Sequence, residues 1–503
     1  MTEEVKKSLE FVKKTLEEAM IYGQASSIIN FDMETICPPA GMEREGEVAA
    51  FLGNKVFTLL KQDEFIKAGE VLYAHKDELD EETAVLATSL HKDYIRNKNI
   101  TPEMNLEFSK IYNKSYVDWV NAKQKKDYSL FAPSLQAVKD IEIKKVELLD
   151  EKKEVLYDNF IDMYEPGMTT KMLDEYFDKC RERLVPMLKK IQNSKKKIRT
   201  DFMFRTVTDE AQQKMARYLL EIMGYDFNRA AFTTTEHPFT TGIGKNDERV
   251  TTHYYPNMFI SSMYSIIHEG GHALFDMYSP AEHWDSFIET EKSMGQHESV
   301  SRFYENRIGR SEAFIHLIYD KVKEIFPEVM ADVSERELYE AVNYVEASLI
   351  RTEADEFTYN FHIMIRYELE KELLNGNITI EELPQKWNDK YEEYLGVRPS
   401  NDAEGVLQDV HWASGFGYFP TYALGNAYNA MYYNRMKNEL DIDKLVSEGH
   451  IDKINEWMKE NVWKRADLLD ADVWLKEITG RDFDPTDFLD YLEEKFSKLY
   501  ELD

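Results

Sequence analysis

The segment Tyr264–Tyr278, YSIIHEGGHALFDMY, is the stretch around which the rest of the chain is organised. It contains His268, Glu269 and His272 in the spacing HExxH. Side chains four residues apart project from one face of an α-helix, so the two imidazoles can share one metal ion, with the glutamate beside the open coordination position. The pattern therefore predicts a helix that carries the metal site of a zinc hydrolase.

The residues around this motif favour a buried helix. Apolar side chains flank it at Met263, Ile266, Ile267, Leu274 and Phe275. Gly270 and Gly271 stand in mid-helix, where each costs about 1 kcal/mol relative to alanine. Sequences break such local rules where function requires it, and glycine here would leave room for a substrate or a neighbouring helix. The alternative is an ordinary core helix with two buried histidines.

A catalytic zinc takes three protein ligands and keeps one position for water. The segment Gly295–Asn306, GQHESVSRFYEN, follows far enough along the chain to form a return helix. Glu298 is the predicted third ligand, which gives the His2Glu ligand set of thermolysin-type peptidases. His297 competes for this role, but adjacent helical residues diverge by about 100°, so both are not expected to bind one ion. A solvated surface glutamate is the alternative.

Composition restricts the partners of the protein. The 503 residues include 62 Lys and Arg against 94 Asp and Glu, a net charge of −32, so neither nucleic acid nor a membrane surface is an expected partner. Cys37 and Cys180 are the two cysteines, and we expect no disulfide framework and a cytoplasmic location. From the apolar patterning we expect neither a secretory signal nor a membrane-spanning segment.

Hydrophobic periodicity predicts helices nearly throughout the chain. Residues 32–41, DMETICPPAG, are predicted to form a turn after the first helix, and residues 334–375 to form one exceptionally long helix. Residues 227–253 are rich in threonine and aromatic residues and predict a small antiparallel sheet beside the HExxH helix. An extended peptide could add to the free edge of the strand immediately before that helix.

We expect the whole chain, residues 1–503, to form one helical domain around a groove. Two lobes are an alternative arrangement, with a helical scaffold or lid at residues 1–160 and a catalytic body at 161–503. No repeat or low-complexity linker interrupts the sequence.

Six short motifs occur in order between His237 and Trp412. They are HPF at 237–239, DERVTT at 247–252, HEGGH at 268–272, HES at 297–299, IRTEAD at 350–355 and GVLQDVHW at 405–412. The set resembles the M32 family of metallocarboxypeptidases. FDMETICP at 31–38 is similar to the family's WDxxTxxP text, with Phe31 in place of tryptophan.

The resemblance implies an all-α fold with a small sheet, in the style of neurolysin and angiotensin-converting enzyme, with a deep substrate groove. It also implies a homodimer that removes single C-terminal residues from peptides with broad specificity. It places the metal on His268, His272 and Glu298, as the spacing does, and makes Glu269 the general base acting on a metal-activated water. Zn²⁺ is the expected ion, and Co²⁺ binds similar ligands.

Two further side chains are assigned by a looser analogy. In the related converting-enzyme fold, a histidine followed by a tyrosine at a similar distance donates hydrogen bonds to the reaction's oxyanion, which implies this role for His411 and Tyr422. Tyr418 competes with Tyr422, for which aromatic core packing is also an alternative.

A carboxypeptidase must recognise a terminal carboxylate, and the planar fork of arginine suits this best. The motifs offer Arg249 and Arg351, which the sequence does not rank. An exposed charge on an edge strand is the alternative for Arg249, and a salt bridge to Asp355 within one helix is the alternative for Arg351. His237 and Gln408 are candidate substrate contacts by their motif positions.

Related peptidases often carry an aspartate four residues after the glutamate ligand to orient a metal-binding histidine, but Arg302 occupies that position here. Asp276 and Asp409 are the candidates for this orienting role. Two other functions stay open: an endo-acting oligopeptidase of the neurolysin type, and a catalytically silent peptide-binding protein.

Overall fold

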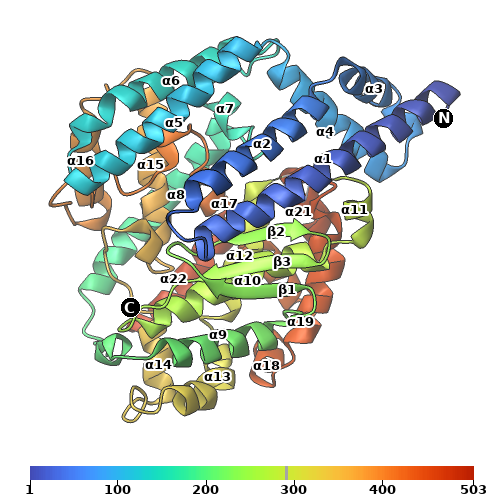
Figure 1. Ribbon diagram of the computed structural model, residues 1–503. Coiled ribbons are helices and arrows are strands. Elements are labelled where there is room, and N and C mark those ends of the chain that lie inside the picture. Colours follow the sequence, from blue (N-terminus) through green and yellow to red (C-terminus); the bar gives the residue numbers. More distant parts are fainter. Residues whose placement is uncertain (289–292, 503) are drawn as a thin grey trace.

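Helices make up most of the protein, and a three-stranded sheet lies against the helix that carries HExxH (Figure 1). The structure is a computed structural model that describes residues 1–288 and 293–502, so residues 289–292 and Asp503 lie outside the described part. The helices before the sheet are α1 (Glu3–Thr35), α2 (Met42–Leu60), α3 (Asp63–Ala74), α4 (Glu81–Asn97), α5 (Pro102–Lys125), α6 (Ala132–Glu147), α7 (Leu156–Ile161), α8 (Thr170–Gln192) and α9 (Asp209–Met223).

The helices after the sheet begin with α10, the HExxH helix. They are α10 (Phe259–Tyr278), α11 (Ala281–Asp285), α12 (Met294–Arg302), α13 (Glu312–Ile325), α14 (Glu335–Val342), α15 (Tyr359–Leu374), α16 (Leu383–Leu395), α17 (Pro420–Lys437), α18 (Ile442–Ser447), α19 (Ile451–Met458), α20 (Lys464–Ala466), α21 (Ala471–Thr479) and α22 (Thr486–Tyr500). The expectation of a predominantly helical body with a small sheet is confirmed.

The N-terminal helix is longer than the sequence predicts. The hydroxyl of Thr2 caps α1 by accepting a hydrogen bond from the Val5 amide, and the helix then continues to Thr35. The predicted turn at 32–41 is therefore wrong in its first four residues, which are helical. Helical structure resumes only at Met42, after a proline pair that cannot donate backbone hydrogen bonds.

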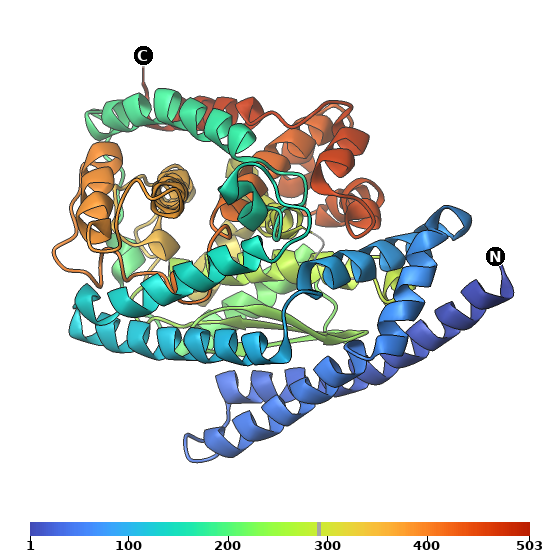
Figure 2. The ribbon, with the colours of Figure 1, turned by 90° about the horizontal axis from the view of Figure 1, so that it is seen from above.

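The N-terminal helices run along one side of the molecule (Figure 2). Helices α1, α3 and α4 share a small apolar core that includes Val12, Leu72 and Leu86. Leu135 of α6 and Phe160 of α7 belong instead to the large core of the remaining helices. A division into lobes at residue 160 stays a prediction.

The sheet differs from the antiparallel sheet that the sequence predicts. Its strands β1 (Ala230–Thr234), β2 (Thr240–Gly244) and β3 (Asp247–Thr252) lie in the order β1-β3-β2. β2 and β3 pair antiparallel, but β1 and β3 pair parallel, so the sheet is mixed. The strand directly before α10 is β3, which is paired on both sides, so the expectation of a free edge on that strand is wrong. The edge strand beside the HExxH helix is β2.

The predicted long helix at residues 334–375 is wrong, because α14 and α15 flank an irregular segment. In that segment the backbone amides find partners outside a helix: Val345 donates to the hydroxyl of Tyr500, and Arg351 to the side-chain oxygen of Gln408. The carboxylate of Asp355 accepts hydrogen bonds from the amides of Phe357 and Thr358 just before α15. These tertiary contacts outweigh a local sequence that is compatible with a helix.

Helix α12 lies between α10 and α17, and a glycine allows each close approach. A Cβ atom on Gly271 of α10 would stand 2.7 Å from the Cα atom of Ser301 in α12. A Cβ atom on Gly425 of α17 would stand 2.7 Å from the Cγ atom of Glu298, also in α12. The sequence predicts that the HExxH glycines leave room for either a substrate or a neighbouring helix. At Gly271 the structure shows a neighbouring helix, α12.

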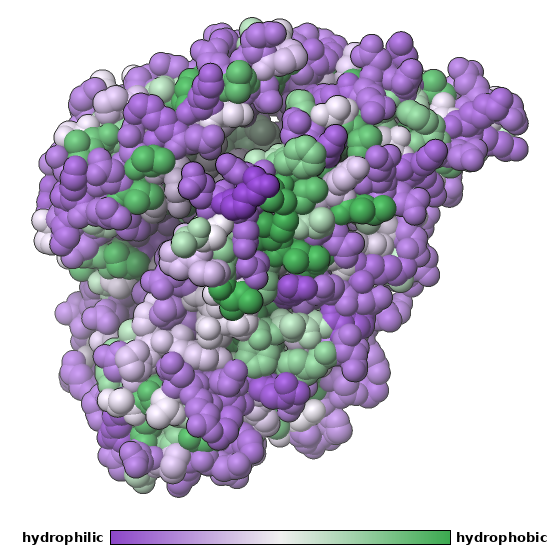
Figure 3. All heavy atoms as spheres, viewed as in Figure 1, coloured by the Kyte–Doolittle hydropathy of each residue, from purple (hydrophilic) through white to green (hydrophobic). Residues whose placement is uncertain are grey.

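The surface is largely hydrophilic on the face shown in Figure 3, in keeping with the net charge of −32. Exposed apolar side chains also occur on α1 and α2, among them Ile21, Ile28 and Phe51. Within the described ranges, no helix has both the length and the apolar composition needed to cross a bilayer. Cys37 and Cys180 are both free thiols.

The two HExxH glycines provide a matched test of helix packing. In Gly271→Ala the new methyl group meets backbone, whereas in Gly270→Ala it meets the flexible ends of Leu220 and Met223. Alanine gains about 1 kcal/mol of helix propensity at either position, but overpacking against backbone costs about 1–3 kcal/mol or more. We expect Gly271→Ala to be the less stable variant by about 2 kcal/mol in urea unfolding. Equal stabilities would contradict the proposed backbone contact.

Candidate metal centre

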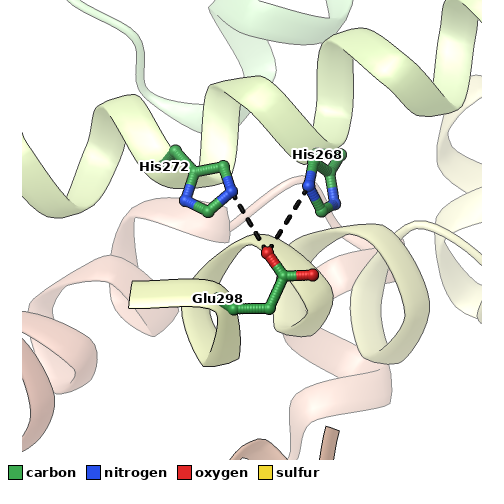
Figure 4. Close-up of side chains that lie close together, drawn as sticks. All are labelled: His268, His272 and Glu298. Carbon is green, nitrogen blue, oxygen red and sulfur yellow. Dashed lines mark ion pairs between the residues drawn. The ribbon is translucent and has the colours of Figure 1, made fainter. Parts of the chain in front are cut away.

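Helix α10 presents His268 and His272 on one face, toward the carboxylate of Glu298 in α12 (Figure 4). The Nε2 atoms of His268 and His272 lie 3.7 Å and 3.3 Å from Oε2 of Glu298. One ligand atom from each of these three residues lies within 4.8 Å of the other two, which is compact enough for one metal ion. The three residues that the spacing predicts are therefore brought together.

The local sequence fixes the start of α12 and with it the position of Glu298. The Ser293 hydroxyl caps this helix by accepting a hydrogen bond from the Gln296 amide. The same hydroxyl donates to the buried carboxylate of Glu165, which also accepts from the Gly295 amide. Glu165 thus anchors the first turn of the helix that carries the proposed third ligand.

His297, the competitor for the third ligand position, lies beside the cluster rather than in it. Its ring stacks on the ring of His272 with centroids 4.7 Å apart, and the two Nδ1 atoms are 2.6 Å apart. Its Nε2 atom lies 3.2 Å from the carboxylate of Asp276. The geometry favours Glu298 as the ligand and gives His297 the role of a neighbour to His272.

The cluster is buried and strongly charged. Burial alone would raise the pKa of Glu298, but Arg302 and the two imidazoles lower it well below its usual range. Burial would lower the pKa of His268, but Glu298 and Glu305 outweigh burial and raise it. Burial together with His297 and His268 lowers the pKa of His272, despite its hydrogen bond with Glu298. The carboxylate is therefore ionised, as a metal ligand must be.

Glu269 lies between the two histidines in sequence and lines a cavity of about 590 Å³. Thr240, at the start of β2, donates a hydrogen bond of 2.7 Å to its Oε2 atom. The same hydroxyl is 2.9 Å from the backbone oxygen of Glu269. His268, His272 and Glu298 line the same cavity, so the glutamate and the candidate metal ligands share one space.

His411 and Tyr422 are in contact at this site. The Nε2 atom of His411 is 3.2 Å from the hydroxyl of Tyr422. Burial, with Arg351 and Arg366 nearby, lowers the pKa of His411 to about 4, so its imidazole is neutral at pH 7. Tyr418 packs edge-on against Tyr422, with ring centroids 5.3 Å apart, and both tyrosines line the cavity.

Arg351 lies in a short 3-10 turn, so the alternative of a salt bridge to Asp355 within one helix is wrong. Its guanidinium instead contacts Asp409 at 2.9 Å and donates to the hydroxyl of Tyr359 at 3.1 Å. The guanidinium carbon also lies 4.8 Å from the ring centroid of Tyr422. Arg351 is thus buried beside the proposed oxyanion residues.

Gln408 holds the segment around Arg351. Its side-chain oxygen accepts hydrogen bonds from the Arg351 amide and the Arg366 guanidinium. Its nitrogen donates to the backbone oxygens of Leu349 and Glu404. Its amide is therefore used inside the protein, and the geometry favours a structural role over the predicted substrate contact.

Arg249 and His237 lie on the sheet side of the site. Arg249 is on the central strand β3, so the expectation of an edge strand is wrong for this residue. Its guanidinium donates two hydrogen bonds of 2.9 Å to Asp247 and lies over the ring of Phe31. His237 is exposed just before β2.

Two contacts of the candidate ligands were not anticipated from the sequence. The Nδ1 atom of His268 lies 2.9 Å from the carboxylate of Glu305, and Arg302 donates to Glu298 at 2.7 Å. The earlier candidates for an orienting group are wrong, because Asp276 contacts His297 and Asp409 pairs with arginines. These contacts could have been predicted from the helical spacing of residues 298, 302 and 305, which places all three on one face.

A glutamate beside two imidazoles and a carboxylate, in a cavity bordered by a strand edge, defines a metallopeptidase site on a helical fold. Comparison with known proteins agrees. Residues 11–496 match the family model described as Carboxypeptidase Taq (M32) metallopeptidase. The chain belongs to this family, and its activity is that of a metallocarboxypeptidase.

The relatives cover nearly the whole chain. Carboxypeptidase 1 of Bacillus subtilis is 37% identical over 484 residues, which are 95% of this chain and 96% of the relative. Thermostable carboxypeptidase 1 of Thermus thermophilus is 34% identical over 505 residues, 98% of each chain. The structure of the M32 carboxypeptidase from Deinococcus radiodurans R1 superposes with a TM-score of 0.93 at 29% identity, covering 99% of this chain and 100% of that chain.

The lowered pKa of His411 predicts an acid-dependent loss of stability. Between its ordinary value near 6.5 and its folded value of about 4, the unfolded chain binds a proton that the folded chain excludes. The free energy of unfolding of the metal-free protein should therefore fall as the pH decreases through this window, by at most about 1.4 kcal/mol per pH unit from this group.

Urea unfolding between pH 4 and 7 tests this expectation. His411→Asn should flatten the pH dependence, whereas His316→Asn, at a side chain that is 62% exposed, should leave it unchanged. Parallel curves for wild type and His411→Asn would refute the assignment of a neutral His411.

Proposed function

We propose that this metallocarboxypeptidase holds Zn²⁺ with His268, His272 and Glu298 and removes single residues from the C-termini of peptides. The observation that carries the proposal is that Oε2 of Glu298 faces the Nε2 atoms of both imidazoles at the wall of the cavity. The donor set fits zinc, and Co²⁺ is an alternative ion. When bound, the ion would lower the pKa of a water molecule toward about 7 and polarise the substrate carbonyl.

In this proposal Glu269 is the general base. Its carboxylate lines the cavity, and the hydrogen bond from Thr240 to Oε2 leaves Oε1 to receive a proton from water. The same carboxyl group then delivers that proton to the departing amine. A group that only exchanges protons in this way forms no covalent bond to the substrate.

His411 and Tyr422 are the proposed donors to the oxyanion. A neutral imidazole carries one N–H, and a pKa near 4 keeps His411 in that form at neutral pH. Burial raises the pKa of Tyr422 well above its ordinary value, so its hydroxyl keeps its proton. In the proposal, Tyr422 donates to the developing charge from the cavity wall, and His411, in contact with its hydroxyl, supports it.

The edge strand β2 offers a path for the rest of the peptide. Thr240, Thr241 and Gly242 of this strand line the same cavity as the candidate metal ligands. An extended substrate could pair its backbone with this edge, which depends little on side-chain identity. Such pairing supports the proposed broad specificity.

Arg351 is the favoured group for the terminal carboxylate. Each arginine pairs with a carboxylate, Arg351 with Asp409 and Arg249 with Asp247. Arg351 also adjoins Tyr422 of the cavity wall, whereas Arg249 lies on the sheet side. An endopeptidase would not need a buried arginine next to the oxyanion donors. We also propose a homodimer in the cytoplasm that acts on peptides with free C-termini.

Mass spectrometry of one unblocked peptide tests the function. Incubation with the zinc-loaded protein should give a ladder of products, each one residue shorter at the C-terminus, and chelation should abolish it. Glu269→Gln should lower kcat by about 10²–10⁴-fold, because the amide cannot accept the proton. The same peptide with an amidated C-terminus is the control, and internal fragments from it would overturn the carboxypeptidase assignment.

The two arginines can be ranked by kinetics. We expect Arg351→Gln to lower kcat/KM by about 10²-fold or more, since charge-assisted bidentate contacts contribute several kcal/mol. Arg249→Gln should change it by less than about threefold. Because Arg351 also pairs with Asp409, the ratio of rates for unblocked and amidated peptides is the deciding readout. A ratio altered by Arg249→Gln alone would reverse the ranking.

A further inference from the structure

Arg302 joins the candidate metal ligand Glu298 to a second buried carboxylate. Its Nε atom donates to Oε1 of Glu298 at 2.7 Å, and its Nη1 atom donates to Oε2 of Glu305 at 3.0 Å. Both carboxylates and the guanidinium are largely buried, with side chains 8–12% exposed. The fork of one arginine therefore fixes two acid groups on neighbouring helical turns.

Besides its bond to Arg302, each of the two carboxylates also contacts a candidate metal-binding histidine. With Oε1 of Glu298 bonded to Arg302, its Oε2 atom is the one that faces the two imidazoles. Oε2 of Glu305 accepts a hydrogen bond of 2.9 Å from Nδ1 of His268, which leaves Nε2 of that ring toward Glu298. Glu298, Arg302, Glu305 and His268 thus form a closed ring of contacts.

Two more groups hold this ring in place. The guanidinium carbon of Arg302 lies 4.0 Å from the ring centroid of Tyr359, so the aromatic face supports the plane of the fork. Arg310 contacts the other oxygen of Glu305 at 3.4 Å. Because both oxygens of Glu305 have partners, its carboxylate is held in the orientation that contacts His268.

A π-helical turn, Phe303–Ile308, follows α12 directly and carries Glu305. Insertions of this kind are rare and occur frequently at functional sites. The turn ends at Gly309, where a Cβ atom would lie 2.7 Å from the backbone oxygen of Glu305. The local backbone is therefore unusual at the point where Glu305 reaches His268.

We propose that Arg302 and Glu305 are positioning residues that set the direction in which Glu298 and His268 present their ligand atoms. The inference rests on the proposed metal site and extends it to groups that do not touch the ion. In related peptidases, an aspartate four residues after the glutamate ligand contacts a metal-binding histidine, and here Glu305 makes that contact. Arg302 determines which oxygen of Glu298 faces the histidines. Partners of this kind typically contribute 10–100-fold to metal affinity.

Zinc affinity, measured by competition with a chromogenic chelator, tests the proposal without relying on turnover. Arg302→Lys keeps the charge but loses the fork, so we expect zinc to bind about 10–100-fold more weakly. Glu305→Gln keeps the size of the side chain but loses the anionic acceptor for His268, and should weaken binding in the same range. Kinetics at saturating zinc should then show a lower kcat with little change in KM.

Arg307→Lys is the matched control, because Arg307 is also buried, on the π-helical turn that follows Arg302, but donates to Asn429 and not to a candidate ligand. It should bind zinc as tightly as wild type, even if urea unfolding shows a comparable loss of stability. Wild-type affinity in Arg302→Lys, or an equal loss in Arg307→Lys, would overturn the positioning role. Failure of the wild-type protein to bind zinc would instead overturn the proposed function, and the positioning role with it.

Discussion

The backbone contact between α10 and α12 is the constraint on which the site depends. Gly271 follows Glu269 by two residues, and its missing side chain lets α12 approach within van der Waals contact of the HExxH helix. Gly425 likewise lets α17 pack closely against α12, directly at Glu298. With both neighbours touching the backbone of α12, Glu298 has little freedom to move away from the histidines. The position of the third candidate ligand is therefore set by helix packing and not by a flexible loop.

Burying so much charge is tolerated because nearly every group has a partner. Arg302 lies between Glu298 and Glu305, and it holds the pKa of Glu305 near 2 together with His268 and Arg310, against the opposing effect of burial. A second buried set, Asp409 with Arg351 and Arg366, lies beside Tyr422. Burial and these two arginines keep His411 neutral, against the opposing effect of Asp409. At neutral pH Glu298, the candidate ligand, is therefore a carboxylate, and His411, the proposed oxyanion donor, is a neutral imidazole.

Local patterns predicted much of this site, while tertiary contacts decided what the sequence could not. The HExxH spacing predicted a helix and two facing imidazoles, because helical geometry alone relates residues four apart. Glu298 followed from the requirement for a third ligand on a nearby helix. The break at residues 343–358 was missed because side chains distant in sequence, such as Tyr500 and Gln408, accept its amide hydrogens. The parallel pairing of β1 with β3 depends likewise on which strands meet in space.

Release of one residue at a time requires a fixed distance between the reacting centre and the group that binds the terminal carboxylate. Tyr359 contacts both parts: the face of its ring supports Arg302, and its hydroxyl accepts a hydrogen bond from Arg351. Tyr359 is 3% exposed and begins α15 directly after the irregular segment that carries Arg351. In the proposed mechanism, a single rigid ring therefore ties the geometry of the metal ligands to that of the carboxylate site. This coupling explains why the chain leaves a helix where its sequence would allow one, since a continuous helix would remove Arg351 from Tyr359 and from Tyr422.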